Sequence, residues 1–332
     1  MSWRTLVVSR RCKLDLCMNY LEIRSEEVKK VHLSELHTLI IESTAVSLTA
    51  ALLNELIHRK VKVIFCDEKR NPASELIPYY GSHDSSACIR QQMAWDQDTK
   101  GLLWAEIIAQ KIRNQQDLLR ECGEIEKAEL LGQYINNIEE ADASNREGHA
   151  ARVYFTGLFG QHFSRSMETP VNAALNYGYS ILLSAFNKEI AGAGYLTQIG
   201  IFHDNMFNPF NLASDLMEPF RPLVDRMVWK MKPAQFEKEE KVTLLNILNQ
   251  KVIIDRQSHF VANAVKIYTR SVIDALNDRK AEGILFYTLD QEKQNNPKNR
   301  PGHAEKMEKS GSALAQKVEK LLQTNRPDSQ RI

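Results

Sequence analysis

The spacing of the apolar residues changes once along this chain, near residues 79–90, and this change limits the folds that the chain can adopt. Before it, segments such as RTLVVS and HTLIIES are rich in β-branched residues and are separated by polar breaks, as strands are. After it, apolar residues recur every three or four positions, as on one face of a helix. The pattern predicts an α+β chain with a small β-rich N-terminal domain, residues 1–84, and a larger all-helical domain, residues 91–289.

The N-terminal segment also contains one expected helix. Leu48, Leu52 and Leu56 are spaced to share one face of a helix, and the apolar strand KVKVIFCD follows it. No glycine-rich loop follows any expected strand, so the chain lacks the fingerprint of a Rossmann or P-loop nucleotide site. Residues 79–90, YYGSHDSSACIR, are polar and rich in turn formers, which predicts a linker.

Start and stop signals divide the helical region. One long amphipathic helix is expected to end near Gly123, and Ser144 is the candidate N-cap of a later helix. Thr169-Pro170 is a stronger start signal, because proline suits the first helical position after an N-cap. Two further helices are expected over Val242–Ile254 and Gln257–Leu276.

Composition excludes several classes of protein. No apolar run is long enough to span a bilayer, which predicts that the protein has no membrane partner. The five cysteines are odd in number and form no CxxC pair, which favours reduced thiols in a cytoplasmic protein. Net charge is only +1, so binding of nucleic acid would need local basic patches. Residues 290–332 are polar with few large apolar residues, which predicts a disordered tail.

A histidine and three acidic residues form the strongest candidate site for chemistry. Asp215 and Glu218 are three positions apart, so they share one face if this segment is helical, and His203 lies twelve residues before Asp215. Glu147, in the segment SNREGHAAR, is a further candidate carboxylate. One imidazole with carboxylates is a suitable ligand set for a hard divalent ion such as Mn²⁺ or Mg²⁺.

Helix capping explains the same spacing without a metal. Asp215-x-x-Glu218 and Ser144-x-x-Glu147 both have the form of a capping box, and His203 would then be an ordinary loop or core histidine. Capping does not require the polar residues that lie among the apolar helices here, and these favour a site: Asn172, Asn176, His203, Asp204, Asn205, Asn208 and Asn211. Spacing alone leaves both interpretations open.

Several long blocks resemble one known family. SNREGHAAR, PVNAALNYGY, AGYLTQIGIFH and SDLMEPFRPLVD are together similar to the CRISPR-associated integrase of spacer acquisition, the Cas-one family. SWRTLVV and IFCDEKRNPASELIPYYGSHDSS resemble the variant from type II systems. The resemblance covers roughly residues 3–288 in order, and it does not extend to the tail.

The resemblance implies a fold and a set of site residues. The family joins a β-rich N-terminal dimerisation domain to a helical catalytic domain. Its metal-binding triad falls by motif on Glu147, His203 and Glu218, which would hold Mg²⁺ or Mn²⁺. Asp215 matches a further acidic position near the metal. Asn172 and Tyr177 match residues that line the catalytic pocket.

The resemblance also implies a reaction and partners. A DNA 3′-hydroxyl attacks a phosphodiester of the CRISPR repeat, and water in its place gives endonuclease activity. Arg146, Arg152 and Arg221 are candidates for phosphate contacts, although each is as well placed to pair with acids inside the helical domain. The expected partners are prespacer and repeat DNA, a second copy of the chain, the Cas-two protein, other type II adaptation proteins and the RNA-guided effector nuclease.

Two other functions fit parts of the sequence. His149, His203-Asp204 and Asp215 imitate the order of ligands in a helical HD-type metal phosphohydrolase. A non-catalytic DNA-binding scaffold, in which the acids only cap helices, is the second alternative. Hydrolysis of nucleotides would indicate the phosphohydrolase. Absence of metal-dependent strand transfer would indicate the non-catalytic scaffold.

Overall fold

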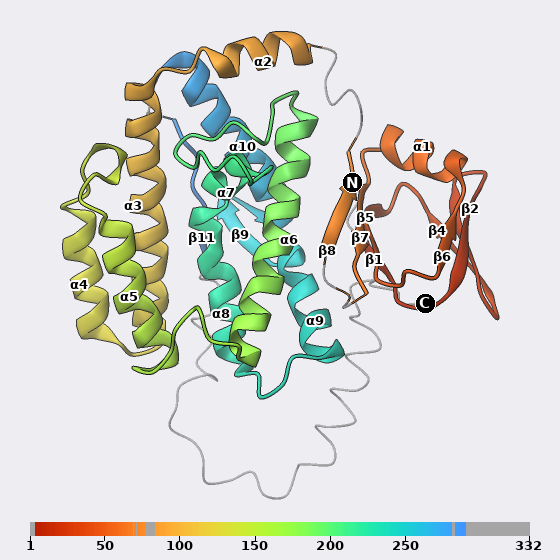
Figure 1. Cartoon of the computed structure of the whole chain (residues 1–332), viewed down its shortest axis with the longest axis horizontal. Coiled ribbons are helices and arrows are strands. Elements are labelled where there is room, and N and C mark those ends of the chain that lie inside the picture. The colour runs from red at the N-terminus through yellow and green to blue at the C-terminus, as the bar shows by residue number, and fades with distance from the viewer. Residues whose placement is uncertain (1–3, 69, 71, 78–83, 281–282, 290–332) are drawn as a thin grey trace, which may run out of the picture. The chain divides into compact units, whose positions relative to one another are not determined.

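The computed structural model divides into two units (Figure 1), and it describes residues 4–68, 70, 72–77, 84–280 and 283–289. One unit holds the described residues up to Leu76, and the other runs from Ile77 to Leu289. The tail expected over residues 290–332 lies outside the described residues. Within the described part of the chain, no helix is long and apolar enough to cross a membrane.

The first unit contains two four-stranded sheets, of order β1-β5-β7-β8 and β4-β3-β2-β6. Strands β1, β5 and β7 are parallel and almost wholly buried, which explains why they read as continuous apolar segments. The elements of this unit are β1 Arg4–Val8, β2 Cys12–Cys17, β3 Tyr20–Arg24, β4 Val28–His32, β5 Leu36–Ile41, β6 Val46–Leu48, α1 Ala50–His58, β7 Lys62–Cys66 and β8 Pro72–Leu76.

One hydrophobic core joins the two sheets of this unit. Leu6, Leu39 and Val63 come from one sheet and Leu14 from the other, and Leu56 of α1 packs on them. The prediction of a β-rich unit with one helix is confirmed here. The sequence pattern misses β2, β6 and β8. In β8, proline and glutamate disfavour a strand, and the segment is tolerated because it pairs antiparallel with β7 at the edge of the sheet.

The second unit is mostly helical. Its elements are α2 Ser85–Met93, α3 Gln97–Glu121, α4 Ile125–Ile135, η1 Glu140–Asp142, α5 Arg146–Phe159, α6 Pro170–Gly192, α7 Asn211–Leu216, η2 Glu218–Phe220, α8 Arg221–Met231, α9 Lys238–Leu245, η3 Asn246–Asn249, β9 Lys251–Ile254, β10 Gln257–Phe260, α10 Val261–Asp278 and β11 Thr288–Leu289. The predicted long helix ending near Gly123 is α3. The start predicted at Thr169-Pro170 is also confirmed, because the Thr169 hydroxyl accepts from the Asn172 backbone N–H at 3.2 Å.

The prediction that this unit is all-helical is wrong. Strands β10, β9 and β11 form an antiparallel sheet, where helices were expected over Val242–Ile254 and from Gln257. Asp255 and Arg256 adopt positive φ angles of 50° and 60°, which make a two-residue hairpin turn that no helix can continue through. A second correction concerns the expected linker, because α2 already begins within it at Ser85.

Helix α3 is the element around which the candidate site is built. It packs against α4 and α5 (Figure 1), and it also contacts η2, α7, α8 and α10. Its buried side chains include Trp104, Ile107, Ile108 and Ile112, which are spaced along one helical face. Segments distant in sequence therefore meet along this single helix.

Candidate metal centre

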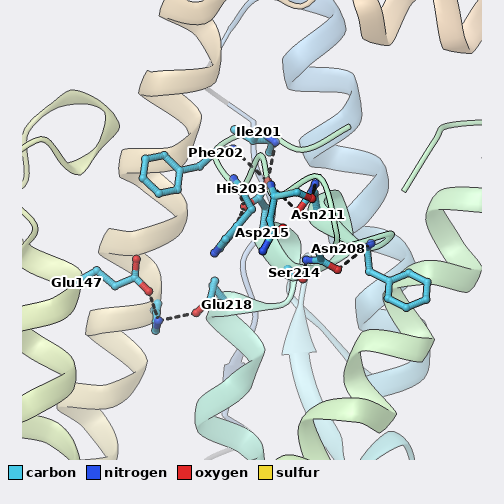
Figure 2. Close-up of polar contacts among 12 residues, drawn as sticks. Glu147, Ile201, Phe202, His203, Asn208, Asn211, Ser214, Asp215 and Glu218 are labelled. Carbon is cyan, nitrogen blue, oxygen red and sulfur yellow. Dashed lines mark hydrogen bonds and ion pairs between the residues drawn. The ribbon is translucent and has the colours of Figure 1, made fainter. Parts of the chain in front are cut away.

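His203 lies in the loop between α6 and α7, and the carboxylate of Asp215 on α7 holds this loop in place (Figure 2). The backbone N–H groups of Ile201 and Phe202 donate to Asp215 Oδ2 at 2.6 and 3.1 Å. The backbone N–H of His203 donates to Oδ1 at 3.1 Å, and the imidazole Nδ1 lies 2.5 Å from the same oxygen. Asp215 is completely buried, so these four contacts satisfy its carboxylate.

This arrangement orients the imidazole. Because an ionised carboxylate only accepts hydrogen bonds, Nδ1 of His203 carries a proton, and Nε2 of the neutral ring is left to bind another group. The hydrogen bond to Asp215 raises the pKa of His203 against the opposing effect of burial. Gly200 allows the close approach, since a Cβ there would lie 2.4 Å from the His203 carbonyl oxygen. Trp104 on α3 supports this loop, because its ring stacks on Phe202 with the ring centres 4.6 Å apart.

Glu147 lies in the first turn of α5, and other residues cap that helix. Asp142 accepts from the backbone N–H groups of Arg146 and Glu147 at 2.8 and 3.0 Å. The N-cap is Asn145, whose side chain accepts from the Gly148 N–H at 3.3 Å. The Glu147 carboxylate is therefore available for a role outside the helix, and it is half-buried beside α3.

Neither predicted capping box forms. The Ser144 cap is wrong, because the Ser144 hydroxyl donates to the Asn137 carbonyl at 3.4 Å instead of accepting from α5. Asp215 accepts from the loop that carries His203, and the Glu218 side chain pairs with cations. Helix capping and metal binding were the two roles considered for Glu147, Asp215 and Glu218. None of the three side chains caps a helix among the described residues.

A buried lysine joins two of the carboxylates. Lys111 Nζ lies 2.6 Å from Glu147 Oε1 and 2.5 Å from Glu218 Oε2, and its side chain is 9 % exposed. Arg221 Nε pairs with the other oxygen of Glu218 at 2.8 Å. Sequence reasoning misses Lys111. The available signal is a lysine among the apolar positions Ile107, Ile108 and Ile112 of an amphipathic helix, where an exposed cation is not expected.

Charges in this cluster stabilise one another. Burial disfavours a charged Lys111, but the carboxylates of Glu218 and Glu147 outweigh burial and raise the lysine pKa. Burial likewise disfavours an ionised Glu218, and Arg221 and Lys111 outweigh it and lower the glutamate pKa. Glu218 is 2 % exposed, so a carboxylate without these cations would not stay ionised there.

The triad residues converge from three elements. Figure 2 shows the side chains of Glu147 on α5, His203 in its loop and Glu218 on η2 directed toward the same region. The Lys111 ammonium contacts both carboxylates. Within the described ranges, no three His, Cys, Asp or Glu side chains are already close enough to share one metal ion. The ammonium fills the space between the carboxylates and separates them.

The donor set fits a divalent cation. Two carboxylates and an imidazole with its Nε2 available are suitable ligands for Mg²⁺ or Mn²⁺. The buried positive charge of Lys111 marks where these residues accommodate a cation. Lysine carries this charge on a flexible four-carbon stem.

Comparisons with known proteins agree with this geometry. The model of the family described as CRISPR associated protein Cas1 matches residues 6–257. The CRISPR-associated endonuclease Cas1 of Neisseria meningitidis serogroup C (strain 8013) is 33 % identical over 86 % of this chain and 95 % of its own length. This chain belongs to the Cas1 family. The family resemblance seen in the sequence is thereby confirmed, and the assignment to the type II variant stays a prediction.

Solved structures share the Cas1 fold of this chain at low sequence identity. A casposase bound to integration product has a TM-score of 0.69 and 18 % identity, and the match covers 96 % of this chain and 99 % of the casposase. A chain of a Cas6-RT-Cas1–Cas2 complex has a TM-score of 0.67 and 16 % identity over 86 % of this chain. This Cas1 spans 36 % of that longer chain. At these identities the likeness concerns the fold.

The alternative of an HD-type phosphohydrolase is wrong, because the chain is a Cas1. The residues that suggested this alternative also have different surroundings and do not form one site. His149 is exposed on α5 and its ring packs against Tyr134 at 6.2 Å, and Asp204 is exposed in the loop. Of that set, His203 and Asp215 form a hydrogen bond with each other.

Asn172 and Tyr177 contact residues other than Glu147, His203 and Glu218. The Asn172 amide donates to the carbonyls of Ser164 and Met167 at 2.8 Å each, and its oxygen accepts from Arg165 at 2.6 Å. It therefore ties the preceding loop to the start of α6. Tyr177 packs edge-on against Phe236 at 5.6 Å, with Lys241 over its ring.

The three candidate arginines differ in their surroundings. Arg221 pairs with Glu218, and its guanidinium lies 4.8 Å from the centre of the Tyr179 ring. Of the two roles considered for Arg221, the structure shows the ion pair with an acid inside the helical domain. Arg152 is exposed and has no ion pair among the described residues. The Nε of Arg146 is buried and has no hydrogen-bond partner in the described part of the chain.

Proposed function

We propose that this Cas1 is a metal-dependent DNA integrase and endonuclease of CRISPR adaptation. It inserts spacer DNA into a CRISPR array by attack of a DNA 3′-hydroxyl on a phosphodiester, and water in place of the hydroxyl gives strand cleavage. The observation that carries the proposal is the meeting of the Glu147 and Glu218 carboxylates at the buried Lys111 ammonium, with the His203 side chain directed toward the same region (Figure 2). The fold shared with a casposase bound to integration product supports integration.

Glu147, Glu218 and Nε2 of His203 would hold one Mg²⁺ or Mn²⁺ ion in place of the Lys111 ammonium. When bound, such an ion polarises a phosphoryl oxygen and stabilises the charge of the transition state. The imidazole nitrogen favours Mn²⁺ somewhat over Mg²⁺. Three protein ligands leave room for the phosphate and the attacking hydroxyl.

The remaining residues position these groups. Asp215 fixes the ring of His203 through Nδ1 and fixes its loop through three backbone N–H groups. Arg152, which is exposed, and Arg146, which is partly buried, would bind phosphates next to Glu147 on the same helix. Arg221 balances the charge of Glu218 and keeps it ionised. Asn172 and Tyr177 would line the outer pocket.

Partners follow from the same proposal. Prespacer and repeat DNA are the substrates. Residues 1–84 form the homodimer contact, and residues 91–289 carry catalysis. The Cas-two protein is the main protein partner, which the shared fold with a Cas6-RT-Cas1–Cas2 complex supports. In a type II system, other adaptation proteins and the RNA-guided effector nuclease complete the assembly.

Strand transfer on a branched DNA, with Mg²⁺ or Mn²⁺ and with excess chelator, tests the proposal. Glu147→Gln and His203→Ala should each reduce strand transfer by at least about a hundredfold, because misplaced reacting groups cost that much. Both variants should stay folded, which circular dichroism checks, although each loses a partner of a buried charged group and should melt earlier than the wild type. Glu129→Gln and His149→Ala, at exposed positions on α4 and α5, are the matched controls and should stay active.

Two results would contradict the proposal. Strand transfer that persists in excess chelator would remove the metal from the mechanism. A wild-type protein that binds the branched DNA and joins no strands in any divalent ion would be a non-catalytic scaffold.

A further inference from the structure

The loop that carries His203 continues into a tip that asparagine side chains hold in place. Asn211, labelled in Figure 2, donates to the carbonyls of Gln198 and Asn205 at 3.0 and 3.1 Å. These bonds join the two sides of the loop. The Thr197 hydroxyl also donates to the Pro209 carbonyl at 2.8 Å, which connects the start of the loop to its end. These bonds close the loop at its base.

Two further asparagines fix the backbone of the tip itself. Asn205 Oδ1 accepts from the Phe207 backbone N–H at 2.9 Å, and Asn208 Oδ1 accepts from the Phe210 N–H at 3.0 Å. Both are local turns in which the asparagine side chain replaces a backbone acceptor. The segment between them therefore has a defined conformation that its own side chains maintain.

The fixed tip presents two large apolar side chains to solvent. Met206 and Phe207 are each 87 % exposed, whereas the neighbouring Phe202 is stacked on Trp104. An ordered loop with exposed apolar residues gains no burial energy within the chain, although ordering it costs conformational entropy. The conformation is therefore explained better by a contact outside the chain.

The position of the tip restricts what that contact can be. Met206 and Phe207 follow His203 by three and four residues, so their Cα atoms lie within about 14 Å of its Cα, at no more than about 3.6 Å per residue. One strand of DNA advances about 3.4 Å per nucleotide. A strand whose phosphodiester reaches the triad thus brings nucleotides within about four positions of the cleaved bond past the tip.

The chemistry of the tip fits a base and not a phosphate. The segment FHDNMFNPFN contains no lysine or arginine, and Asp204 is exposed beside the two apolar residues. A phosphate would meet a carboxylate there, whereas the face of a base requires only an apolar or aromatic surface. Methionine adapts its shape to aromatic rings and suits the same contact.

We propose that Met206 and Phe207 form a binding site for an unstacked nucleobase of the DNA substrate, next to the phosphodiester that reacts. This inference rests on the proposed function, because it takes DNA as the substrate of the triad. Phe207 stacks on the base and Met206 packs against its edge. The contact holds the strand so that the phosphodiester stays aligned with His203.

A fluorescent base reports the contact without any catalysis. Branched DNAs would carry 2-aminopurine at each of the four positions on either side of the reacting phosphodiester, and binding would be measured in excess chelator. Binding of the wild type should change the fluorescence strongly at one or two positions, because a stacked ring alters the emission of the base. Phe207→Ala should abolish that change, and Phe207→Tyr should restore it.

Affinity gives a second readout. Stacking on one base is worth about 1–3 kcal/mol, so Phe207→Ala should weaken binding of the branched DNA by about five- to 150-fold at fixed salt. Met206→Ala should weaken it less. Ile125→Ala, a substitution of a 50 % exposed apolar residue on α4, is the control and should leave affinity and fluorescence unchanged. All variants should melt as the wild type does, since the side chains are exposed.

Each outcome decides for or against the site. Unchanged fluorescence and affinity in Phe207→Ala would overturn the inference. Loss of self-association or of protein partner binding in Phe207→Ala, with DNA binding unchanged, would overturn it in favour of a protein contact. Strand transfer by the wild type on the same DNA tests the proposed function separately, because the fluorescence change requires binding and no reaction.

Discussion

Glu218 and Asp225 lie seven residues apart on η2 and α8, both are buried, and their surroundings act oppositely on their charge. Burial opposes the ionised form of Glu218, but Arg221 and Lys111 lower its pKa below the ordinary value. Asp225 accepts from the hydroxyls of Tyr154, at 2.8 Å, and Tyr179. Burial outweighs these hydrogen bonds and raises the pKa of Asp225 to about 6.

The difference corresponds to two roles: Glu218 is a proposed ligand of a divalent ion, and Asp225 is a contact between helices. A carboxylate that binds a divalent ion has to be ionised at neutral pH, and the cations beside Glu218 achieve this. Asp225 joins α5, which carries Tyr154, and α6, which carries Tyr179, to α8. The charge of the partners, and not burial, therefore distinguishes the two roles.

The largest expected effect is on activity. Glu218→Gln should reduce strand transfer by at least about a hundredfold, since a neutral amide is a poor ligand for a hard cation. Asp225→Asn keeps the shape of the side chain and should retain activity within about tenfold. Strand-transfer rates of both variants in Mn²⁺ check this. Equal losses in the two variants would remove the distinction between them.

Lys111→Met tests the ammonium as the internal cation of the site. Without divalent ions, this variant should lose about 3 kcal/mol of unfolding free energy, because it leaves two carboxylates facing each other without their cation. Addition of Mn²⁺ should restore most of that loss, since the ion can take the place of the ammonium. Thermal and urea unfolding with and without Mn²⁺ measure both effects.

Lys127→Met is the matched control for Lys111→Met. Lys127 pairs with Glu124 on the surface of α4, where the two side chains are 28 % and 39 % exposed. Its loss should cost at most about 1 kcal/mol and should not respond to Mn²⁺. Equal stability losses in the two variants, or a Mn²⁺ response in both, would contradict the role of Lys111.

The pH dependence of stability should single out Asp225. Its pKa of about 6 in the folded protein lies above the unfolded value of 3.8, so the folded protein binds this proton more tightly. The stabilising contribution is complete below about pH 4 and is lost as pH rises through about 6, in total about 3 kcal/mol. Asp225→Asn does not titrate, so its stability relative to wild type should increase over this pH range. Urea unfolding at several pH values measures the difference, and a constant difference would contradict the shift.

The smallest expected effect distinguishes capping from ion binding. Asp142→Ala removes the acceptor of two N–H groups at the start of α5 and should cost about 0.5–2 kcal/mol of stability. Ser144→Ala, two positions later, should change stability by less than about 0.5 kcal/mol. Thermal melts of the two variants check the order, and the reverse order would restore the capping box that the sequence suggests.

Motif positions predict Glu147, His203 and Glu218 as metal ligands, and that assignment stays a prediction. The contact of His203 with Asp215 is local in sequence, since the two residues are twelve positions apart. Lys111 is not predictable in the same way, because its partners lie 36 and more than a hundred residues away in the chain. Only the packing of α3 between α5 and η2 brings these charges together.

The fold shows the same limit. Thr169-Pro170 and the long apolar face of α3 depend on local signals, so sequence reasoning places them correctly. Residues 251–260 are misassigned because KVII and its neighbours have short apolar runs that suit a helix or a strand. The turn at Asp255 and Arg256 decides for a hairpin. Aspartate is enriched at positive φ, but arginine gives no such signal, and no glycine or asparagine marks the turn.

Binding of Mn²⁺, followed by the EPR signal of the free ion, tests most directly whether Glu147, His203 and Glu218 share one metal. The proposal predicts that the wild type binds one Mn²⁺ per chain in this site. Glu147→Gln, His203→Ala and Glu218→Gln should each weaken binding by about tenfold or more, and Glu129→Gln should bind as the wild type does. Equal Mn²⁺ affinity in the wild type and all three triad variants would contradict the shared metal site.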